Sequence, residues 1–202
     1  MNIEVKNSVK LIDYNESIYA LENRVNDVLA GKKSELLWLL EHNSVYTAGT
    51  SAKKEDLIDK SIKAIKTKRG GKYTLHSPGQ KVVYFVLNLN KREKDIRKLI
   101  SKIETCIIKI LKEYNIKSNS DSRNIGIWVN DEKIAAIGVR VKKWIAYHGF
   151  SINVNNNLEN YNKIIPCGIK DKGIINLKLV KDQNYDELSD KIINNFIKNL
   201  EI

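Results

Sequence analysis

The sequence predicts a mixed, largely antiparallel β-sheet with helices packed against it, a fold of the α/β or α+β class. Two long segments carry apolar residues at helical spacing, and short runs rich in Val, Ile and aromatic residues have the composition of strands. Helices and strands do not alternate strictly, which favours hairpins over a purely parallel sheet. With 202 residues, two Pro, ten Gly and no repeat, the chain is expected to form a single domain over residues 1–202.

One helix and two buried strands are expected in the first half of the chain. Residues 9–14 alternate as in a strand, and Asn15 can cap a helix that ends at Gly31. The apolar positions of this helix recur at helical spacing: Ile18, Leu21, Val25, Val28 and Leu29. Residues 35–42 and 82–89 are apolar runs that predict buried strands, and a long polar loop is expected over 43–57.

The second half begins with the clearest helix of the sequence. From Ile96 to Tyr114 the apolar residues form an i, i+3, i+4 stripe, the pattern of an amphipathic helix on a sheet. Strand-like segments follow at 125–130, 133–141 and 144–154, and their short connections predict an antiparallel meander. Helical spacing returns over residues 186–200.

The basic composition permits two interpretations. Lys and Arg total 35 against 24 Asp and Glu, a formal charge of +11, which favours an acidic partner. The basic residues are dispersed along a chain rich in Lys, Asn and Ile, so a solvated basic surface also explains them. No apolar stretch suits a signal peptide or a membrane span, and two cysteines make no disulfide framework. We therefore expect a cytoplasmic protein with free thiols.

Cys167 is the stronger nucleophile candidate of the two cysteines. Its neighbours Pro166 and Gly168 disfavour a helix or a central strand, so the thiol is expected on a loop. Cys106 falls at the edge of the apolar stripe of the long helix and is expected to be a small core residue. A loop cysteine can also be a partly buried thiol without a role, and position alone leaves this open.

An ammonium near a thiol lowers the pKa of the thiol and so increases the reactive thiolate, which makes a lysine partner worth seeking. Lys133 is a candidate, because the following residues on its strand face are apolar. The simpler interpretation is a hairpin lysine that reaches solvent.

The segment 69–80, RGGKYTLHSPGQ, combines paired glycines, a cation and a histidine before a buried strand. Paired glycines let a backbone approach a ligand, and Arg69 can meet a phosphate or a carbonyl, but an ordinary turn fits the segment too. It is neither a Walker A loop nor a dinucleotide fingerprint. His148 is either a core histidine or a site residue, and His42 is a weaker candidate. No spacing suits a metal site, and no cofactor is expected.

Five segments together resemble the lipoate-protein ligase B family of octanoyltransferases. They are EHNSVYTAG (41–49), RGGKYTLHSPGQ (69–80), KIAAIGVRV (133–141), YHGFSINV (147–154) and IIPCG (164–168). They occur in the family's order and include both the lysine and the Pro-Cys-Gly. Three positions depart from the family pattern: Ser77 stands where Gly is usual, Leu75 where an aromatic residue is common, and Ala136 where Ser is frequent.

The resemblance implies the fold of biotin and lipoate protein ligases and a Cys/Lys acyltransferase. It implies that Cys167 takes an octanoyl group from acyl carrier protein as a thioester, and that Lys133 holds the thiolate and moves protons. The implied acceptors are lipoyl domains of 2-oxoacid dehydrogenases and the glycine cleavage H protein. Neither nucleic acid nor a membrane is an expected partner, and a monomer is expected. The residues implied to line the acyl pocket are Arg69, Gly70, Gly71, Lys72, Tyr73, Thr74, Leu75, His76, Ala136, Ile137, Gly138, Gly149, Phe150 and Ser151.

If the donor is the acidic carrier protein, the positive charge of this chain is expected to help bind it. Five lysines are expected to form its docking rim: Lys66, Lys68, Lys72, Lys142 and Lys143. The rival interpretations are an ATP-dependent lipoate or biotin ligase, a lipoyl amidotransferase, and a basic nucleic-acid-binding module. The pattern of the ATP-dependent ligases has an acidic residue just after the histidine of the glycine-rich turn, whereas this chain has Ser77 at that position. The aromatic residues are not interleaved with basic ones as a nucleic-acid platform requires.

Overall fold

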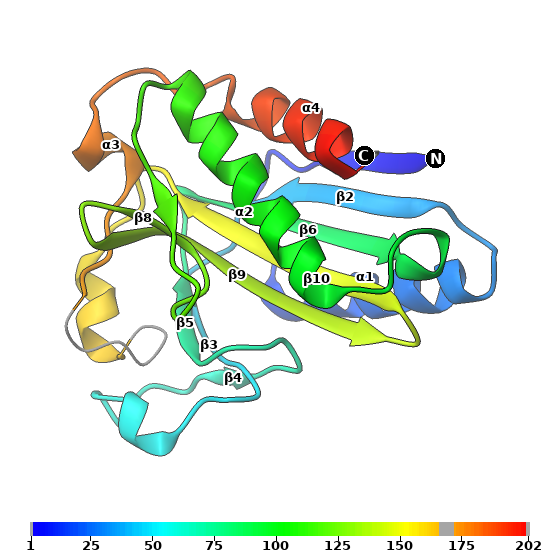
Figure 1. Ribbon diagram of the computed structural model, residues 1–202. Coiled ribbons are helices and arrows are strands. Elements are labelled where there is room, and N and C mark those ends of the chain that lie inside the picture. Colours follow the sequence, from blue (N-terminus) through cyan, green and yellow to red (C-terminus); the bar gives the residue numbers. More distant parts are fainter. Residues whose placement is uncertain (1, 166–171, 201–202) are drawn as a thin grey trace.

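The computed structural model describes residues 2–165 and 172–200, and its centre is a seven-stranded sheet (Figure 1). The strands of this sheet are β1 (Ile3–Asn7), β2 (Glu35–Leu40), β6 (Gln80–Asn88), β7 (Asn119–Ser120), β8 (Ile127–Val129), β9 (Glu132–Lys142) and β10 (Ile145–Asn153). Their order is β1-β2-β6-β10-β9-β8-β7, and β1 and β2 are parallel while the other neighbours are antiparallel. The prediction of a mixed, largely antiparallel sheet is confirmed.

Helices cover both faces of the sheet, as predicted. The long ones are α1 (Tyr14–Leu29), α2 (Ile96–Glu113) and α4 (Leu188–Leu200), and the short α3 (Leu177–Val180) precedes α4. Figure 1 shows α2 and α4 side by side over one face and α1 beneath the other. In β2, Leu37 and Leu39 belong to the core under α2 and α4, whereas Leu36, Trp38 and Leu40 belong to the core over α1. Burial on both faces explains why this strand reads as a continuous apolar run.

The helix α2 forms where its stripe predicts. The Asp95 side chain accepts a hydrogen bond from Lys98 N at 3.0 Å and caps the first turn. The stripe residues are buried against the sheet: Leu99, Ile103, Ile107, Ile110 and Leu111. Cys106 lies among them with 1% of its surface exposed, so the prediction of a core residue is confirmed. Burial raises the pKa of the Cys106 thiol to about 12 and leaves it unreactive near neutral pH.

The meander of β8, β9 and β10 is also confirmed, and its tight turns have the backbone that such hairpins need. Asn130 and Asp131 connect β8 to β9 with φ angles of 48° and 64°. Lys143 and Trp144 connect β9 to β10 with φ angles of 50° and 63°. Positive φ at both central residues is the signature of a type I′ turn, whose twist matches paired strands.

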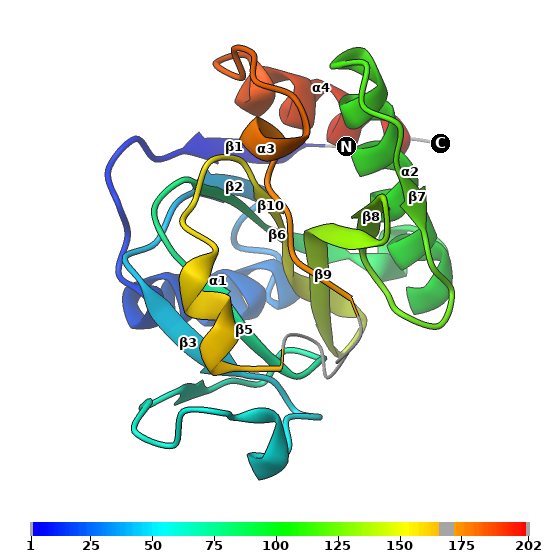
Figure 2. The same ribbon diagram turned by 90° about the vertical axis from the view of Figure 1, so that its left-hand side faces the viewer.

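A second, three-stranded sheet was not predicted. It consists of β3 (Val45–Ala48), β4 (Ile65–Lys66) and β5 (Tyr73–His76), in the order β4-β3-β5. Figures 1 and 2 both place it on the side of the large sheet that α1 occupies, opposite α2 and α4. The expected loop over 43–57 was therefore wrong for β3, because a strand of four residues is too short to show a clear periodicity. Within the described residues, 3₁₀ turns are formed by η1 (Lys54–Asp56), η2 (Leu89–Lys91) and η3 (Glu159–Lys163).

The N-terminal strand and cap were misplaced. The strand predicted at 9–14 is absent apart from one bridge between Ile12 and His42, and β1 lies earlier in the chain. Since β1 is an edge strand with mostly exposed side chains, it carries no alternating signal. The helix cap is Asp13, which accepts from Asn15 N at 2.8 Å, so Asn15 is already inside the first turn. Gly31 follows the helix with a φ of 69°, as its predicted end requires.

Gly149 allows β10 to pair closely with β6. A Cβ at this position would lie 1.9 Å from the carbonyl oxygen of Val83, a backbone atom that cannot move aside. Replacing Gly149 by Ala is expected to lower the free energy of unfolding by about 3 kcal/mol through overpacking. Chemical denaturation measures this against Gly31→Ala, where a Cβ meets nothing within 4 Å. A loss no larger than that of Gly31→Ala would contradict the prediction.

Candidate active site

A cavity of about 60 Å³, lined mainly by apolar surface, lies between the small sheet and the strands β9 and β10. All residues expected to line an acyl pocket border this cavity except Leu75. Side chains alternate along β5, so Thr74 and His76 reach the cavity while Leu75 packs with Tyr161 and Ile164 on the other side. The structure thus brings together residues from 69–76, β9 and β10 that are far apart in the sequence.

Four further residues line the cavity: Tyr14, Val82, Tyr84 and His148. Val82 and Tyr84 share one face of β6, so strand alternation could have found them once the cavity face was known. Tyr14 is the first residue of α1, and no pattern in the sequence connects it to β9 or β10. His148, for which the sequence left a core role and a site role open, borders the cavity.

Arg69 braces the glycine-rich segment. Its Nη2 donates to Thr47 Oγ1 at 2.7 Å and to Thr47 O at 3.1 Å, and Nη1 donates to Gly70 O at 3.0 Å. The Gly70 amide donates to Val139 O at 3.3 Å, which connects the segment to β9. Close contact with β3 requires Gly49, because a Cβ there would meet Gly71 O at 2.2 Å. These contacts hold the cavity wall in place.

All three histidines of the chain lie in one aromatic cluster beside the cavity. His42 lies 5.6 Å from His76, and Tyr84 lies 5.7 Å from His42 and 6.3 Å from His148, between ring centroids. The pKa of His76 and that of His148 are each lowered to about 3, mainly because both side chains are buried. Burial likewise lowers the pKa of His42 and raises that of Tyr84 well above 10. The cluster is therefore uncharged near neutral pH, which suits an apolar ligand.

The hydrogen bonds of Gln80 fix the tautomer of His76. The Gln80 amide nitrogen donates to Asn153 Oδ1 at 2.9 Å and to Leu75 O at 3.3 Å, so Gln80 Oε1 is turned toward the histidine. His76 Nδ1 lies 2.7 Å from this oxygen and must donate to it. The neutral ring then carries its lone pair on Nε2.

His148 has a strained backbone at the cavity wall. Its φ is 67° within a strand, in the left-handed region that residues other than Gly, Asn and Asp rarely adopt. The side chain is 3% exposed, and Nδ1 has no hydrogen-bond partner among the residues that the structure describes. A strained, buried and polar residue at a cavity is a candidate for a functional role.

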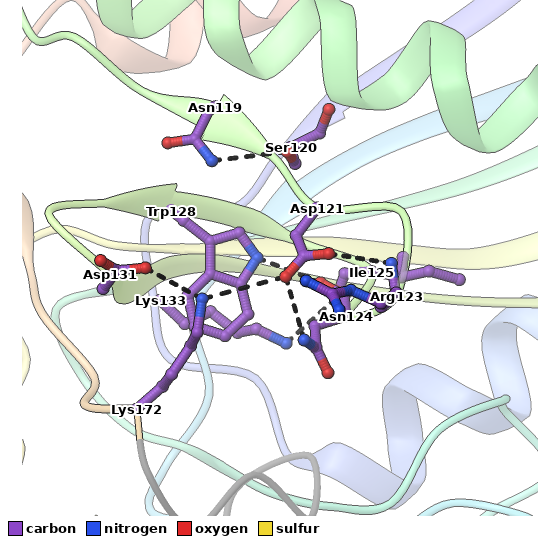
Figure 3. A network of polar contacts seen from close by, with 10 residues as sticks. All are labelled: Asn119, Ser120, Asp121, Arg123, Asn124, Ile125, Trp128, Asp131, Lys133 and Lys172. Carbon is purple, nitrogen blue, oxygen red and sulfur yellow. Dashed lines mark hydrogen bonds and ion pairs between the residues drawn. The ribbon is translucent and has the colours of Figure 1, made fainter.

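Lys133 does not reach solvent. Its side chain is 3% exposed at the start of β9, which excludes the interpretation of an ordinary hairpin lysine. Nζ donates to Ile125 O at 3.0 Å and lies 4.8 Å from the centre of the Trp128 ring (Figure 3). The backbone of Lys133 pairs with the segment after the undescribed residues: its N donates to Gly173 O, and Ile175 N donates to Lys133 O. The lysine ammonium is thus buried three residues before the cavity wall at Ala136.

Cys167, Pro166 and Gly168 lie outside the described residues. On one side, Ile165 N donates to Asp56 O at 2.7 Å; on the other, Lys172 Nζ pairs with Asp131 Oδ1 at 3.0 Å. A second cavity, of about 690 Å³, is lined by Ile165, Lys172 and Glu132 together with residues of η3. Ile165 and Lys172, on either side of the segment that holds Cys167, therefore border the same cavity as Glu132, the residue before Lys133.

Of the lysines expected to form the docking rim, Lys68 and Lys142 line one small pocket together with Glu22 and Asn26 of α1. Lys142 and Lys143 lie at the far end of β9 and in the following turn, nine or more residues from Lys133. At about 3.3 Å per residue, this separates them from Lys133 by roughly 30 Å. Lys72 pairs with Asp56 beside the cavity, and Lys68 pairs with Glu22 of α1. Strand length, which the sequence alone left undefined, places Lys142 and Lys143 away from Lys133.

No three or more His, Cys, Asp or Glu side chains in the described part of the chain are arranged to hold a metal ion. None of the helices within residues 2–165 and 172–200 has the length and apolar character needed to cross a bilayer.

Comparison with known proteins gave matches along nearly the whole chain. Residues 13–197 match the lipoyl protein ligase A/B catalytic domain family. A protein named octanoyltransferase from Wolbachia pipientis subsp. Culex pipiens is 44% identical over 197 residues, which cover 95% of this chain and 96% of that one. The octanoyltransferase of Anaplasma phagocytophilum is 43% identical and covers 98% and 99% of the two chains.

Solved structures share the fold at lower identity. The lipoate complex of Plasmodium falciparum LipL1 has a TM-score of 0.74 at 23% identity, and the match covers 99% of this chain but 63% of that one. A lipoate-protein ligase A bound with ATP has a TM-score of 0.76 at 14% identity, with 98% and 86% of the chains covered. These structures support the fold assignment made from the sheet and helices above.

Proposed function

The chain belongs to the lipoyl protein ligase A/B catalytic domain family, and on this premise we propose that it transfers an octanoyl group to a lysine of a lipoyl domain. It is an acyltransferase, as its relatives named octanoyltransferase are. The observation that carries the proposal is the narrow apolar cavity with an uncharged aromatic floor, whose wall includes Ala136, three residues after the buried Lys133 on β9. Such a space suits an alkyl chain, because each buried methylene contributes about 0.8 kcal/mol.

In the first step, the Cys167 thiolate attacks the thioester carbon of octanoyl acyl carrier protein. The Lys133 ammonium favours the thiolate, and the carbonyl oxygen becomes an oxyanion in the tetrahedral intermediate. The carbon–sulfur bond to the carrier breaks, the Lys133 ammonium gives its proton to the departing carrier thiolate and becomes a neutral amine, and octanoyl remains on Cys167. One thioester replaces another, so this step needs no ATP.

In the second step, the neutral amine of the acceptor lysine attacks the octanoyl-Cys167 thioester. The new carbon–nitrogen bond forms, the carbon–sulfur bond breaks, and Cys167 leaves as a thiolate. Lys133, a neutral amine after the first step, accepts the proton that the acceptor amine loses and becomes the ammonium again beside the Cys167 thiolate. The product is an amide, which is more stable than the thioester and drives the transfer forward.

The support for pairing Cys167 with Lys133 is the surroundings of the two positions. Ile165 and Lys172, on either side of the segment that holds Cys167, border one cavity with Glu132. Gly173, close after Cys167, hydrogen-bonds to the Lys133 amide. The other cysteine is excluded by its burial in the core under α2.

Intact mass spectrometry tests the proposal. Incubation with octanoyl acyl carrier protein is expected to add one octanoyl group to the wild type and to Cys106→Ala, and none to Cys167→Ser. Addition of an apo-lipoyl domain without ATP is expected to move the group to the acceptor. Transfer that requires ATP and free octanoate would instead indicate a ligase, and an adduct on Cys167→Ser would exclude Cys167 as the nucleophile.

A further inference from the structure

We propose that residues 121–126 and Trp128 form a lysine clamp that fixes the Lys133 ammonium for acyl transfer, with Gly126 and Trp128 as positioning residues (Figure 3). This inference rests on the proposed function, which gives the ammonium its task. The segment 121–128 lies outside the five motifs that resemble the family.

Gly126 gives the Lys133 side chain its path. It has a φ of 140°, a conformation that side chains with a Cβ rarely adopt. A Cβ on Gly126 would lie 3.0 Å from Lys133 Cε and 3.2 Å from Lys133 Nζ. It would also lie 2.7 Å from Ala135 O, a backbone atom of β9. A larger residue must therefore shift the Ala135 carbonyl of β9 and crowd the end of the lysine side chain.

Trp128 supplies the opposite wall. It pairs with Lys133 across β8 and β9, and the lysine Nζ lies 4.8 Å from its ring centre. An ammonium over an indole face is attracted by the negative face of the ring, more strongly when both are buried. Trp128 is 2% exposed, and its Nε1 donates to Asn124 O at 3.0 Å, so the ring cannot turn freely.

Hydrogen bonds within the segment hold its shape. Asp121 Oδ1 accepts from Arg123 N at 2.9 Å, and Asp121 Oδ2 accepts from Asn124 Nδ2 at 3.0 Å. This arrangement presents the Ile125 carbonyl to Lys133 Nζ at 3.0 Å. The carbonyl and the ring together define where the positive charge lies.

A second ammonium shares the ring. Lys172 Nζ lies 4.7 Å from the Trp128 ring centre, so two cations approach one indole. Asp131 at 3.0 Å and Asp121 at 3.9 Å offset the charge of Lys172. Figure 3 shows both carboxylates turned toward the Lys172 ammonium, whereas Lys133 runs under the ring toward Ile125. Because Asp121 and Asp131 neutralise Lys172, the Lys133 ammonium can lie close to this second lysine.

A lysine side chain has four rotatable bonds, and an ammonium that moves by a few ångströms loses much of its effect on a neighbouring thiolate. A fixed ammonium avoids this loss at the moment of reaction. The clamp should therefore affect the reactivity of Cys167 without touching the acyl cavity.

The pH dependence of Cys167 alkylation by iodoacetamide tests the inference in the full chain, with Cys106→Ala as background so that one thiol reports. Lys133→Met is expected to move the midpoint upward toward that of an unperturbed thiol, near 8.5. Gly126→Ala should move the midpoint in the same direction by a smaller amount and reduce kcat for octanoyl transfer, with little change in KM for the acceptor. Gly31→Ala, a positive-φ glycine with nothing within 4 Å of its Cβ, is the matched control and should leave the midpoint unchanged.

A second pair of variants serves if Gly126→Ala fails to fold. Trp128→Leu should shift the midpoint, and Trp128→Phe, which keeps a ring face, should shift it less; thermal unfolding reports whether both are folded. Unchanged midpoints in Gly126→Ala and Trp128→Leu overturn the clamp. An unchanged midpoint in Lys133→Met overturns it too, because the ammonium then has no effect on the thiol. Failure of the proposed function is seen separately, as the absence of an octanoyl adduct on the wild type.

Discussion

Lys133→Met is expected to slow octanoyl transfer about a thousandfold while the protein stays folded. The loss has two causes: fewer Cys167 residues are ionised, and no group accepts the proton of the attacking amine. Methionine fills the space of the lysine stem without a charge, which suits a site that is 3% exposed. Single-turnover mass spectrometry measures both steps, formation of octanoyl-Cys167 and formation of the amide on the acceptor.

Lys142→Met is the matched control for this variant. Lys142 lies on the same strand and donates to Asn26 Oδ1 at 3.1 Å, at the end of β9 opposite Lys133. With saturating carrier protein, where a weaker docking contact does not limit the rate, Lys142→Met should transfer octanoyl at the wild-type rate. If Lys133→Met transfers within a factor of ten of the wild type, Lys133 is not the group that activates the thiol. A drop in the thermal midpoint alone would indicate a structural role through Ile125 O.

Much of the large sheet and its helices could be predicted because burial leaves a periodic signal. The stripe of α2 and the apolar runs of β2 and β6 report which faces meet the core, and the core on both sides of the sheet agrees with them. The small sheet could not be predicted, since β3 and β5 have four residues each and are half-buried. Their pairing depends on contacts such as Arg69 with Thr47, which no local pattern reveals.

The candidate site, too, could be predicted only in part. The residues 69–76 and the central parts of β9 and β10 were identified by resemblance, and the fold brings them to one cavity. Tyr14 could not be identified from the sequence, because the cavity floor is made by elements that pack together only in the folded chain. Gly126 and Trp128 were missed for a similar reason. In a sequence, a glycine suggests a turn and a tryptophan suggests a core residue. Only the distances to Lys133 in the folded chain indicate that the two residues position this lysine.

The buried histidines predict that acid destabilises the protein well before most of its carboxylates are protonated. The pKa of His76 and of His148 falls from about 6.5 in the unfolded chain to about 3 in the fold, mainly through burial. Protons therefore bind the unfolded state more strongly between these values. The stability is complete above pH 6.5 and is lost as the pH falls toward 3. From pH 7 to pH 4.5, each histidine is expected to remove roughly 2.7 kcal/mol, or about 5 kcal/mol for the two. Urea denaturation at both pH values measures the loss.

His148→Asn separates this effect from a general response to acid. Asparagine tolerates the φ of 67° that β10 imposes and carries no titrating group, so the fold should persist. The loss of stability from pH 7 to pH 4.5 should then shrink by roughly 2.7 kcal/mol, because His148 no longer takes up a proton on unfolding while His76 and His42 still do. The lowered pKa of His148 also reflects Arg69 and Arg140, after burial, so Arg140→Met should reduce the loss by a smaller amount. Equal losses in His148→Asn and the wild type would mean that the pKa of His148 is the same in the folded and unfolded chain, and burial in the cavity floor would then not be what keeps this ring neutral.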